Sequence, residues 1–165
     1  MKIDWKKVVR EIPEEEQLKI LEERRRKWKP DESRDGVIET WRKTFTYKGI
    51  KFQLAILRYY TLDEGFRPLL HRISDRYVVV EYPKSSQSLV NFIKSLGWDD
   101  FLWYDTVHFW NENQTLEEQL DEAYEYAIKC IDELPKFLKK KEKELKKTIE
   151  KIRKWKAKIV KGGRR

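Results

Sequence analysis

Hydrophobic residues recur with different periods along the chain, and each period predicts a different kind of element. At the N-terminal end, Pro13 stands at a first helical turn, three glutamates follow it, and basic residues fill the last turns before Trp28. This arrangement predicts a helix over residues 13–28. Pro30, Ser33 and Gly36 then mark a loop, after which the period changes to two.

The alternation over residues 37–56 predicts a β-hairpin. One face of its first strand carries Val37, Trp41, Phe45 and Tyr47. One face of its return strand carries Ile50, Phe52, Leu54 and Ile56. Lys48-Gly49 supplies the turn between them.

Further elements complete a mixed pattern. Residues 77–82 predict a strand that Pro83 ends, residues 85–97 a short helix, and residues 101–110 another strand. Thr115 and Glu118 form a capping box that opens a long helix. The element order α-β-β-β-α-β-α predicts an α+β fold, with helices packed on an antiparallel or mixed sheet of four or five strands.

A heptad repeat runs through the long helix, with apolar residues at Tyr124, Ile131, Leu138, Leu145, Ile152 and Ile159. The repeat keeps its phase across Pro135, and no Gly, Asn or Ser lies between residues 128 and 147 to make a turn. We therefore expect one helix that is kinked at Pro135 and whose basic half extends beyond the rest of the domain. In the alternative, the basic half folds back on the acidic residues 112–133 and its charge is neutralised internally.

Charge is divided unevenly along the 165 residues, whose net charge is +8. The last thirty residues hold 15 Lys and Arg against 3 Glu, a balance of +12, and the first 135 residues hold 22 bases against 26 acids, a balance of −4. This division predicts a globular α+β domain over residues 1–134 and a polybasic helical extension over residues 135–165.

A dense cationic helix predicts contact with a polyanion, and nucleic acid is the commonest polyanion in cells. Twelve of the fifteen cations are lysines, which suit neutralisation of phosphates better than base readout. We therefore expect non-specific, salt-dependent binding of DNA or RNA by an accessory protein without catalysis. The candidate residues are Lys139, Lys140, Lys143, Lys146, Lys147, Lys151, Arg153, Lys154, Lys158, Lys161, Arg164 and Arg165.

Six aromatic residues fall within residues 98–110, and on a strand they would occupy both faces. Trp103 and Trp110 are therefore candidates for stacking on bases. In the alternative interpretation, helices cover both faces of a central strand and the rings belong to the core.

A second function class follows from the heptad repeat. Leu138, Leu145, Ile152 and Ile159 could form a coiled-coil seam, so that the chain serves in assembly and forms a homodimer. Lys141 and Thr148 interrupt this seam. No apolar run approaches the roughly 20 residues of a membrane span, so we expect no stable membrane insertion. The single Cys130 and the absence of a signal-peptide pattern favour a cytoplasmic location.

Catalytic signals are few. With one Cys and two His there is no zinc-finger spacing, no glycine-rich phosphate loop occurs, and no metal or cofactor is expected. The element order over about 100 residues resembles the core of the restriction-endonuclease-like nucleases. That family holds Mg²⁺ with an Asp and a Glu-x-Lys motif, and the nearest match here, Glu81-Tyr82-Pro83-Lys84, has one residue too many. The possible Asp partners, Asp63 and Asp75, lie in predicted loops. A divergent metal-dependent nuclease is therefore the third hypothesis, after nucleic-acid binding and assembly.

Overall fold

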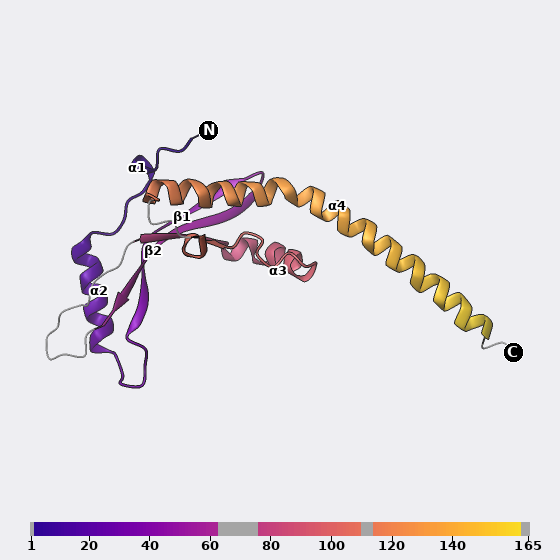
Figure 1. The fold of residues 1–165 in the computed structure, drawn as a ribbon, viewed down its shortest axis with the longest axis horizontal. Helices are drawn as coiled ribbons and strands as arrows, with labels where there is room; N and C mark the ends of the chain where they lie inside the picture. Colours follow the sequence, from indigo (N-terminus) through magenta and orange to yellow (C-terminus); the bar gives the residue numbers. More distant parts are fainter. Residues whose placement is uncertain (1, 63–75, 110–113, 163–165) are drawn as a thin grey trace. The chain divides into compact units, whose positions relative to one another are not determined.

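The computed structural model describes residues 2–62, 76–109 and 114–162, and the chain divides into two compact units, residues 1–128 and 129–165. The elements, shown in Figure 1, are α1 (Trp5–Val8), α2 (Glu14–Arg26), β1 (Asp35–Tyr47), β2 (Ile50–Thr61), β3 (Arg76–Glu81), the 3-10 helix η1 (Lys84–Ser86), α3 (Gln87–Ser95), β4 (Tyr104–Asp105), the 3-10 helix η2 (Thr106–Phe109) and α4 (Leu116–Gly162). The predicted α+β fold is confirmed, and α1, η1 and η2 are added to the predicted order.

The four strands form one antiparallel sheet in the order β1-β2-β3-β4. The predicted hairpin is confirmed, because Tyr47 pairs with Ile50 across a two-residue turn. Lys48 and Gly49 both have positive φ angles, 48° and 79°. Such turns match the twist of the flanking strands, which explains why a glycine stands at the second position.

A β-bulge in β1 places Val37 on the opposite face of the sheet from the one that the sequence predicts. The register with β2 shifts between Glu39 and Trp41, so Val37 lies on the opposite face from Trp41, Phe45 and Tyr47. The extra residue is Thr40, which is buried. Its hydroxyl donates a hydrogen bond to Glu11 Oε1 at 2.7 Å, and the hydroxyl oxygen lies 3.3 Å from the Ile56 carbonyl oxygen. Val37 instead joins a small cluster with Ala55, Tyr77 and Val79.

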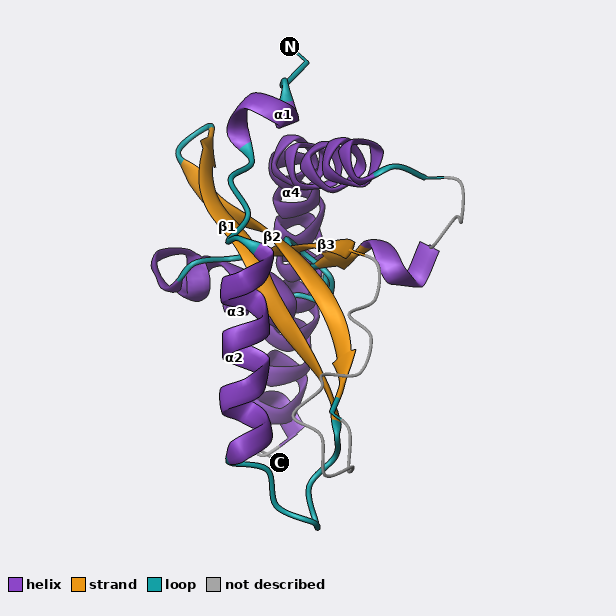
Figure 2. Cartoon of the chain, turned by 90° about the vertical axis from the view of Figure 1, so that its left-hand side faces the viewer, coloured by secondary structure: helices purple, strands orange, loops and turns teal. Residues whose placement is uncertain are grey.

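The main core lies on the other face of the sheet, where Phe52, Leu54, Ile56, Val78 and Val80 are fully buried. Helix α2 lies beside the hairpin in Figure 2, and Arg24 Nη1 on α2 donates to the Val37 carbonyl at 2.8 Å. The first turns of α4 and the short α1 contribute a ring cluster that joins Trp5, Phe45, Phe52 and Tyr124. Aromatic contacts between distant segments thus fix the ends of the first unit together.

The strand predicted over residues 101–110 is only two residues long. Leu102 has a φ of 55°, which no strand allows, and β4 pairs with β3 only at Tyr104 and Asp105. After β4 a side chain replaces the backbone ladder, because the Thr106 hydroxyl accepts the Val78 N–H at 3.0 Å and donates to the Val78 carbonyl at 3.1 Å. Phe101 and Leu102 are fully buried, whereas Trp103 is 46% exposed, so the alternative of a central strand with all its rings in the core is wrong.

Two tyrosines of this unit predict a loss of stability at high pH. Burial, and then a hydrogen bond that the hydroxyl donates to Glu122 Oε1 at 2.6 Å, raise the pKa of Tyr104 well above its usual value. Burial also raises the pKa of Tyr77. A raised pKa means that the folded state holds a proton which the unfolded state releases near pH 10. We expect the free energy of unfolding to be constant up to about pH 9.5 and to fall above about pH 10, by at most about 1.4 kcal/mol per pH unit for each tyrosine.

Urea unfolding between pH 8 and pH 11 measures this effect. Tyr104→Phe should reduce the slope above pH 10, because phenylalanine has no proton to lose. An unchanged slope in that variant would show that Tyr104 does not contribute.

Candidate nucleic-acid interface

Helix α4 carries the predicted basic residues, and it is continuous from Leu116 to Gly162 with Pro135 inside it. It begins at the predicted capping residue, because the Thr115 hydroxyl accepts the Glu118 N–H at 3.2 Å. The alternative in which the basic segment turns back at Pro135 onto the acidic segment is therefore wrong. Buried side chains recur along α4 as far as Leu134, and from Glu142 to Gly162 every residue is exposed.

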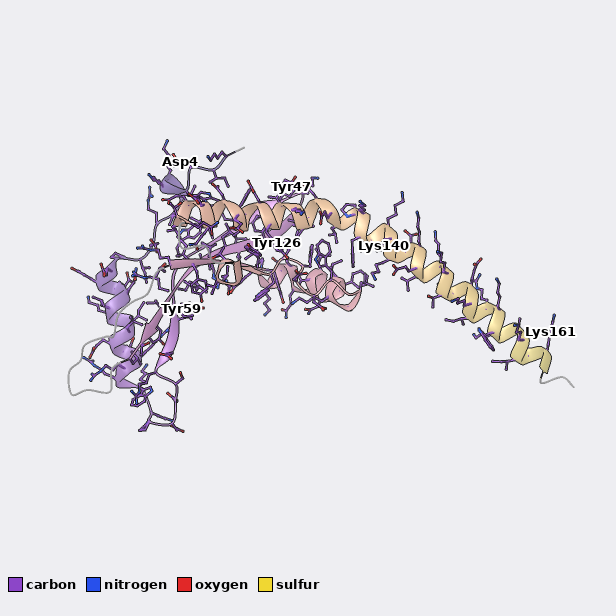
Figure 3. The ribbon with its side chains drawn as sticks, viewed as in Figure 1. Asp4, Tyr47, Tyr59, Tyr126, Lys140 and Lys161 are labelled. Atoms are coloured by element: carbon purple, nitrogen blue, oxygen red, sulfur yellow. The ribbon has the colours of Figure 1, made fainter. Side chains whose placement is uncertain are left out.

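Eight lysines form a continuous row along the second half of α4. We call this row the lysine stripe: Lys136, Lys140, Lys143, Lys147, Lys151, Lys154, Lys158 and Lys161. Successive members are three or four residues apart, so all of them lie on one side of the helix. All are exposed, and the row is about 37 Å long. Figure 3 labels Lys140 and Lys161, which stand near its two ends.

Most of the predicted contact residues belong to the lysine stripe or stand beside it. Lys139, Lys146 and Arg153, spaced by seven residues, run along one border of the stripe. Arg164 and Arg165 lie outside the described residues. The prediction missed Lys136, although its distance of four residues from Lys140 places it in the same row.

Few acidic groups compete for these cations. In the described part of residues 135–165, ion pairs join Lys141 to Glu144 at 3.2 Å and Lys146 to Glu142 at 3.5 Å, and neither includes a member of the lysine stripe. Both pairs are solvent-exposed, so they contribute little to stability. The ammonium groups of the stripe are therefore available to an external anion.

One aromatic side chain stands among these lysines. Trp155 is 65% exposed, and the Lys158 ammonium lies 5.4 Å from the centre of its ring. Lys151, Lys154, Trp155, Ala157 and Lys158 line a shallow hollow of about 330 Å³. Cations around an exposed indole suit a phosphate with an unstacked base beside it.

The predicted stacking residues are not brought together on a strand. Trp103 is 46% exposed but precedes β4, in the segment that follows the turn at Leu102. Trp110 lies outside the described residues. Trp155 is more exposed than Trp103 and stands beside cations, which makes it the better candidate for stacking.

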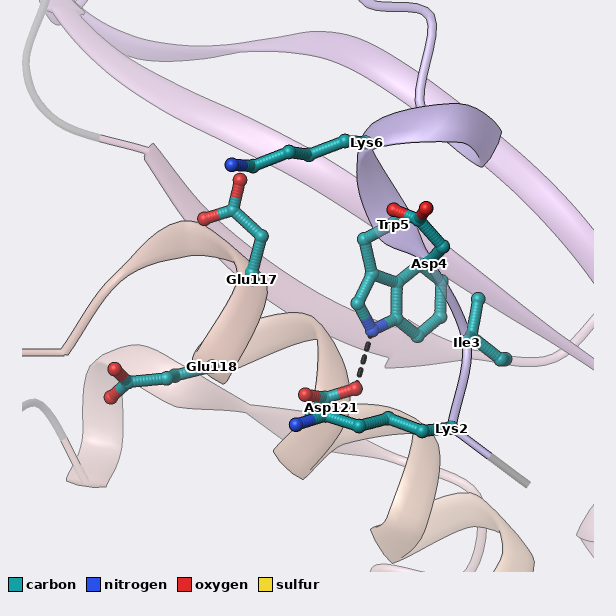
Figure 4. Close-up of a pocket in the computed structure, with 8 residues that line it drawn as sticks. All are labelled: Lys2, Ile3, Asp4, Trp5, Lys6, Glu117, Glu118 and Asp121. Atoms are coloured by element: carbon teal, nitrogen blue, oxygen red, sulfur yellow. Dashed lines mark hydrogen bonds between the residues drawn. The ribbon is translucent and has the colours of Figure 1, made fainter.

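The first unit has a pocket of a different character, shown in Figure 4. Lys2, Ile3, Asp4, Trp5, Lys6, Glu117, Glu118 and Asp121 line this hollow of about 490 Å³. Its charges are mixed, and the buried Trp5 donates its indole N–H to Asp121 Oδ1 at 2.5 Å. We assign this contact a structural role, because it holds α1 against the start of α4.

No family model, curated protein or solved structure matches the chain. Among the described residues, no helix is long and apolar enough to cross a bilayer. Function must therefore be inferred from the side chains themselves.

The residues that the nuclease hypothesis would use do not form a metal site in the described part of the chain. Glu81 Oε2 lies 2.8 Å from Arg42 Nη2, and Glu39 binds the same guanidinium at 2.8 and 2.6 Å. Lys84 lies beyond the end of β3, in η1, and Asp63 and Asp75 are outside the described ranges. Where the structure is described, no three His, Cys, Asp or Glu side chains are placed to hold a metal ion. These residues therefore give the nuclease hypothesis no support.

Proposed function

We propose that this protein is a non-catalytic accessory protein of the cytoplasm that binds the phosphate backbone of DNA or RNA through the lysine stripe of α4. The observation that supports the proposal is the unbroken row of eight exposed lysines, none of them in an ion pair with a described acidic residue. A polyphosphate presents charge at regular short intervals, and a straight row of ammonium groups matches that pattern without reading bases.

The composition of the row favours phosphate contact over sequence recognition. Every member is lysine, a point charge on a flexible stem, whereas guanine readout uses the planar fork of arginine. Arg153 is the one arginine between residues 135 and 162. We therefore expect affinity to depend on salt concentration and hardly at all on base sequence.

A salt titration tests the proposal. If about five lysines contact phosphates, the logarithm of the association constant should fall with the logarithm of salt concentration at a slope of about −4.5. Fluorescence anisotropy with labelled random-sequence DNA and RNA, from about 50 to 200 mM salt, measures the slope. Replacing the lysines of the stripe with arginine keeps the charge and should keep the binding. Absence of affinity at about 50 mM salt would contradict the proposal.

A second candidate function is assembly, and one observation favours it. Large apolar side chains on the other side of the same helix are exposed, among them Leu145 at 54%, Ile152 at 51% and Ile159 at 69%. Apolar residues repeated along one side of an exposed helix are typical of a surface that another helix covers. The lysine stripe and these apolar side chains lie on opposite sides of α4, so a single chain can bind phosphates and a second helix; Trp155 stands between the two sides.

A further inference from the structure

The second half of α4 has an apolar surface whose described side chains are largely exposed. We call it the apolar stripe: Leu138, Leu145, Ile149, Ile152, Trp155 and Ile159. These side chains occupy about a third of the helix circumference. Leu138 is half-buried, and the exposed fractions of the others lie between 47% and 69%. Water contact with so much apolar surface is unfavourable, which favours a partner helix.

We infer that a second copy of this chain covers the apolar stripe, and that the two copies of α4 run antiparallel. This inference rests on the assembly role proposed for the stripe and does not depend on phosphate contact by the lysine stripe. A dimer that encloses Trp155 removes that ring from base stacking. In an antiparallel pair, residues at the first core position of a heptad face residues at the fourth. Leu145 of one copy then faces Trp155 of the other, and Ile152 faces the small Thr148.

The charges beside the apolar stripe select the antiparallel orientation. Glu142, Ile149 and Lys156 follow one edge of the stripe, and Glu144, Lys151 and Lys158 follow the other edge. Antiparallel helices bring like edges together, so that Glu142 meets Lys156 and Glu144 meets Lys158, each twice by symmetry. Ile149 meets its own copy and extends the apolar contact, and Lys151 meets Lys151 as the one repulsive pair. The sum is four attractive pairs against one repulsive pair.

A parallel pair has the opposite balance. It brings unlike edges together with an offset of five residues, so that Lys151 meets Lys156 twice. Glu144 then faces Ile149, and Glu142 faces Phe137. No opposite charges meet across the parallel contact, so its edge charges only repel.

The same charges select one antiparallel register. If one helix is shifted by seven residues so that the contact moves toward the C-terminal ends, Lys151 of each copy faces Lys158 of the other. Among the described residues, this register has two repulsive pairs and loses the attractive pairs of Glu142 and Glu144. A shift of seven residues in the other direction places Leu134, which is 6% exposed, in the seam and leaves only Glu144 with Lys151 as an attractive pair. The register that pairs Leu145 with Trp155 is therefore the favoured one.

Both glutamates are able to change partners. In the single chain Glu142 and Glu144 pair with Lys146 and Lys141. The carboxylate side chains are 67% and 50% exposed in these pairs, so exchange for a partner on the second helix has a low energetic cost. Six members of the lysine stripe lie away from the seam, and only Lys151 and Lys158 stand at its edge. A dimer therefore keeps a cationic outer surface.

A charge exchange in the full-length chain tests the orientation. Glu142→Lys with Glu144→Lys makes all four attractive edge pairs repulsive between two such copies, and Lys156→Glu with Lys158→Glu makes the same four pairs repulsive with the opposite sign. Each variant alone should dimerise at least about tenfold more weakly than the natural chain. An equimolar mixture should form a heterodimer, because all four pairs are then attractive. Sedimentation velocity without nucleic acid measures these states.

Matched controls separate edge contacts from net charge. Lys140→Glu with Lys147→Glu changes the net charge as much as the Lys156/Lys158 variant but lies away from the seam, so its dimerisation should not weaken. A parallel dimer predicts the opposite for Lys156→Glu with Lys158→Glu, which would dimerise more tightly because Lys151 would meet a glutamate. That result, or a natural chain that stays monomeric at about 100 µM, would overturn the inference.

A disulfide measures the register directly. Thr148→Cys and Ile152→Cys chains, one of them tagged, should cross-link with each other after mixing, and neither should cross-link with itself. Homodimeric cross-links in the separate samples would instead show a parallel seam, since like positions then meet. The natural chain, whose Cys130 is buried, is the control. Nucleic-acid binding by a monomeric chain would overturn this inference and leave the proposed function standing.

Discussion

Truncation after Leu134 is expected to abolish binding of DNA and RNA while leaving the first unit folded. The removed residues carry a charge of +12, and the remaining chain has a charge of −4, which repels a polyphosphate. Leu134 is the last buried residue in the described part of the chain, so the described side chains that the cut removes are half-buried or exposed. We expect affinity at about 50 mM salt to fall at least about a hundredfold. Fluorescence anisotropy measures the affinity, and thermal unfolding checks the fold.

Charge variants of the full chain provide the matched control for the truncation. Lys140→Glu with Lys147→Glu and Lys154→Glu reverses three charges of the lysine stripe without shortening the helix, and should also weaken binding strongly. A truncated protein that binds as well as the whole chain would contradict the proposal. The exposed Trp103 would then be the next residue to replace.

Leu145→Asp combined with Ile152→Asp is expected to convert a dimer into a monomer. Both side chains lie in the apolar stripe, and a seam that enclosed their carboxylates would lose several kcal/mol, because a buried charge without a partner is strongly unfavourable. Neither side chain packs in the core, since both are more than half exposed. The first unit should therefore keep its unfolding temperature.

Size-exclusion chromatography with light scattering measures the mass of this variant. Lys140→Asp combined with Lys147→Asp places the same two side chains on the opposite side of the helix and should leave the mass unchanged. If the Leu145/Ile152 variant has the same mass as the natural chain, the apolar stripe is not a seam.

Local chemistry accounts for the parts of the fold that the sequence predicted. The turn at Lys48-Gly49 needs positive φ angles, and the helix at Thr115 needs a hydroxyl cap; both requirements are visible in a few adjacent residues. The apolar run of β3 was also visible, because strands that are buried on both faces lack polar alternation.

Distant contacts account for the parts that were missed. The bulge at Thr40 depends on contacts of its hydroxyl with Glu11 and with the Ile56 carbonyl, neither of which is a neighbour in sequence. Helix α1 has only four residues, and its Trp5 is buried through contacts with Phe45 and Tyr124. Such contacts between distant residues leave no periodic pattern in the sequence from which they could be predicted.

The candidate site was more predictable than the fold around it. Exposed cations on a helix are placed by helical periodicity alone, which is why the sequence already names most members of the lysine stripe. Their contact with phosphates stays a prediction. Lys136 was missed because the three residues that follow Pro135 contain no dense run of charge. Trp155 became a candidate for base stacking only from the structure, which shows the hollow that it lines and the Lys158 ammonium beside its ring.

The lysine stripe also works against the helix that carries it. Lys143, Lys147 and Lys151 follow one another at intervals of four residues, and Lys136 with Lys140 and Lys154 with Lys158 have the same spacing. Like charges at this spacing destabilise a helix by a few tenths of a kcal/mol per pair. Added salt screens this self-repulsion, so the helicity of residues 136–162 should increase with ionic strength while polyanion affinity decreases. A bound phosphate chain would neutralise the same repulsion, which makes helix formation in this segment a part of the binding equilibrium.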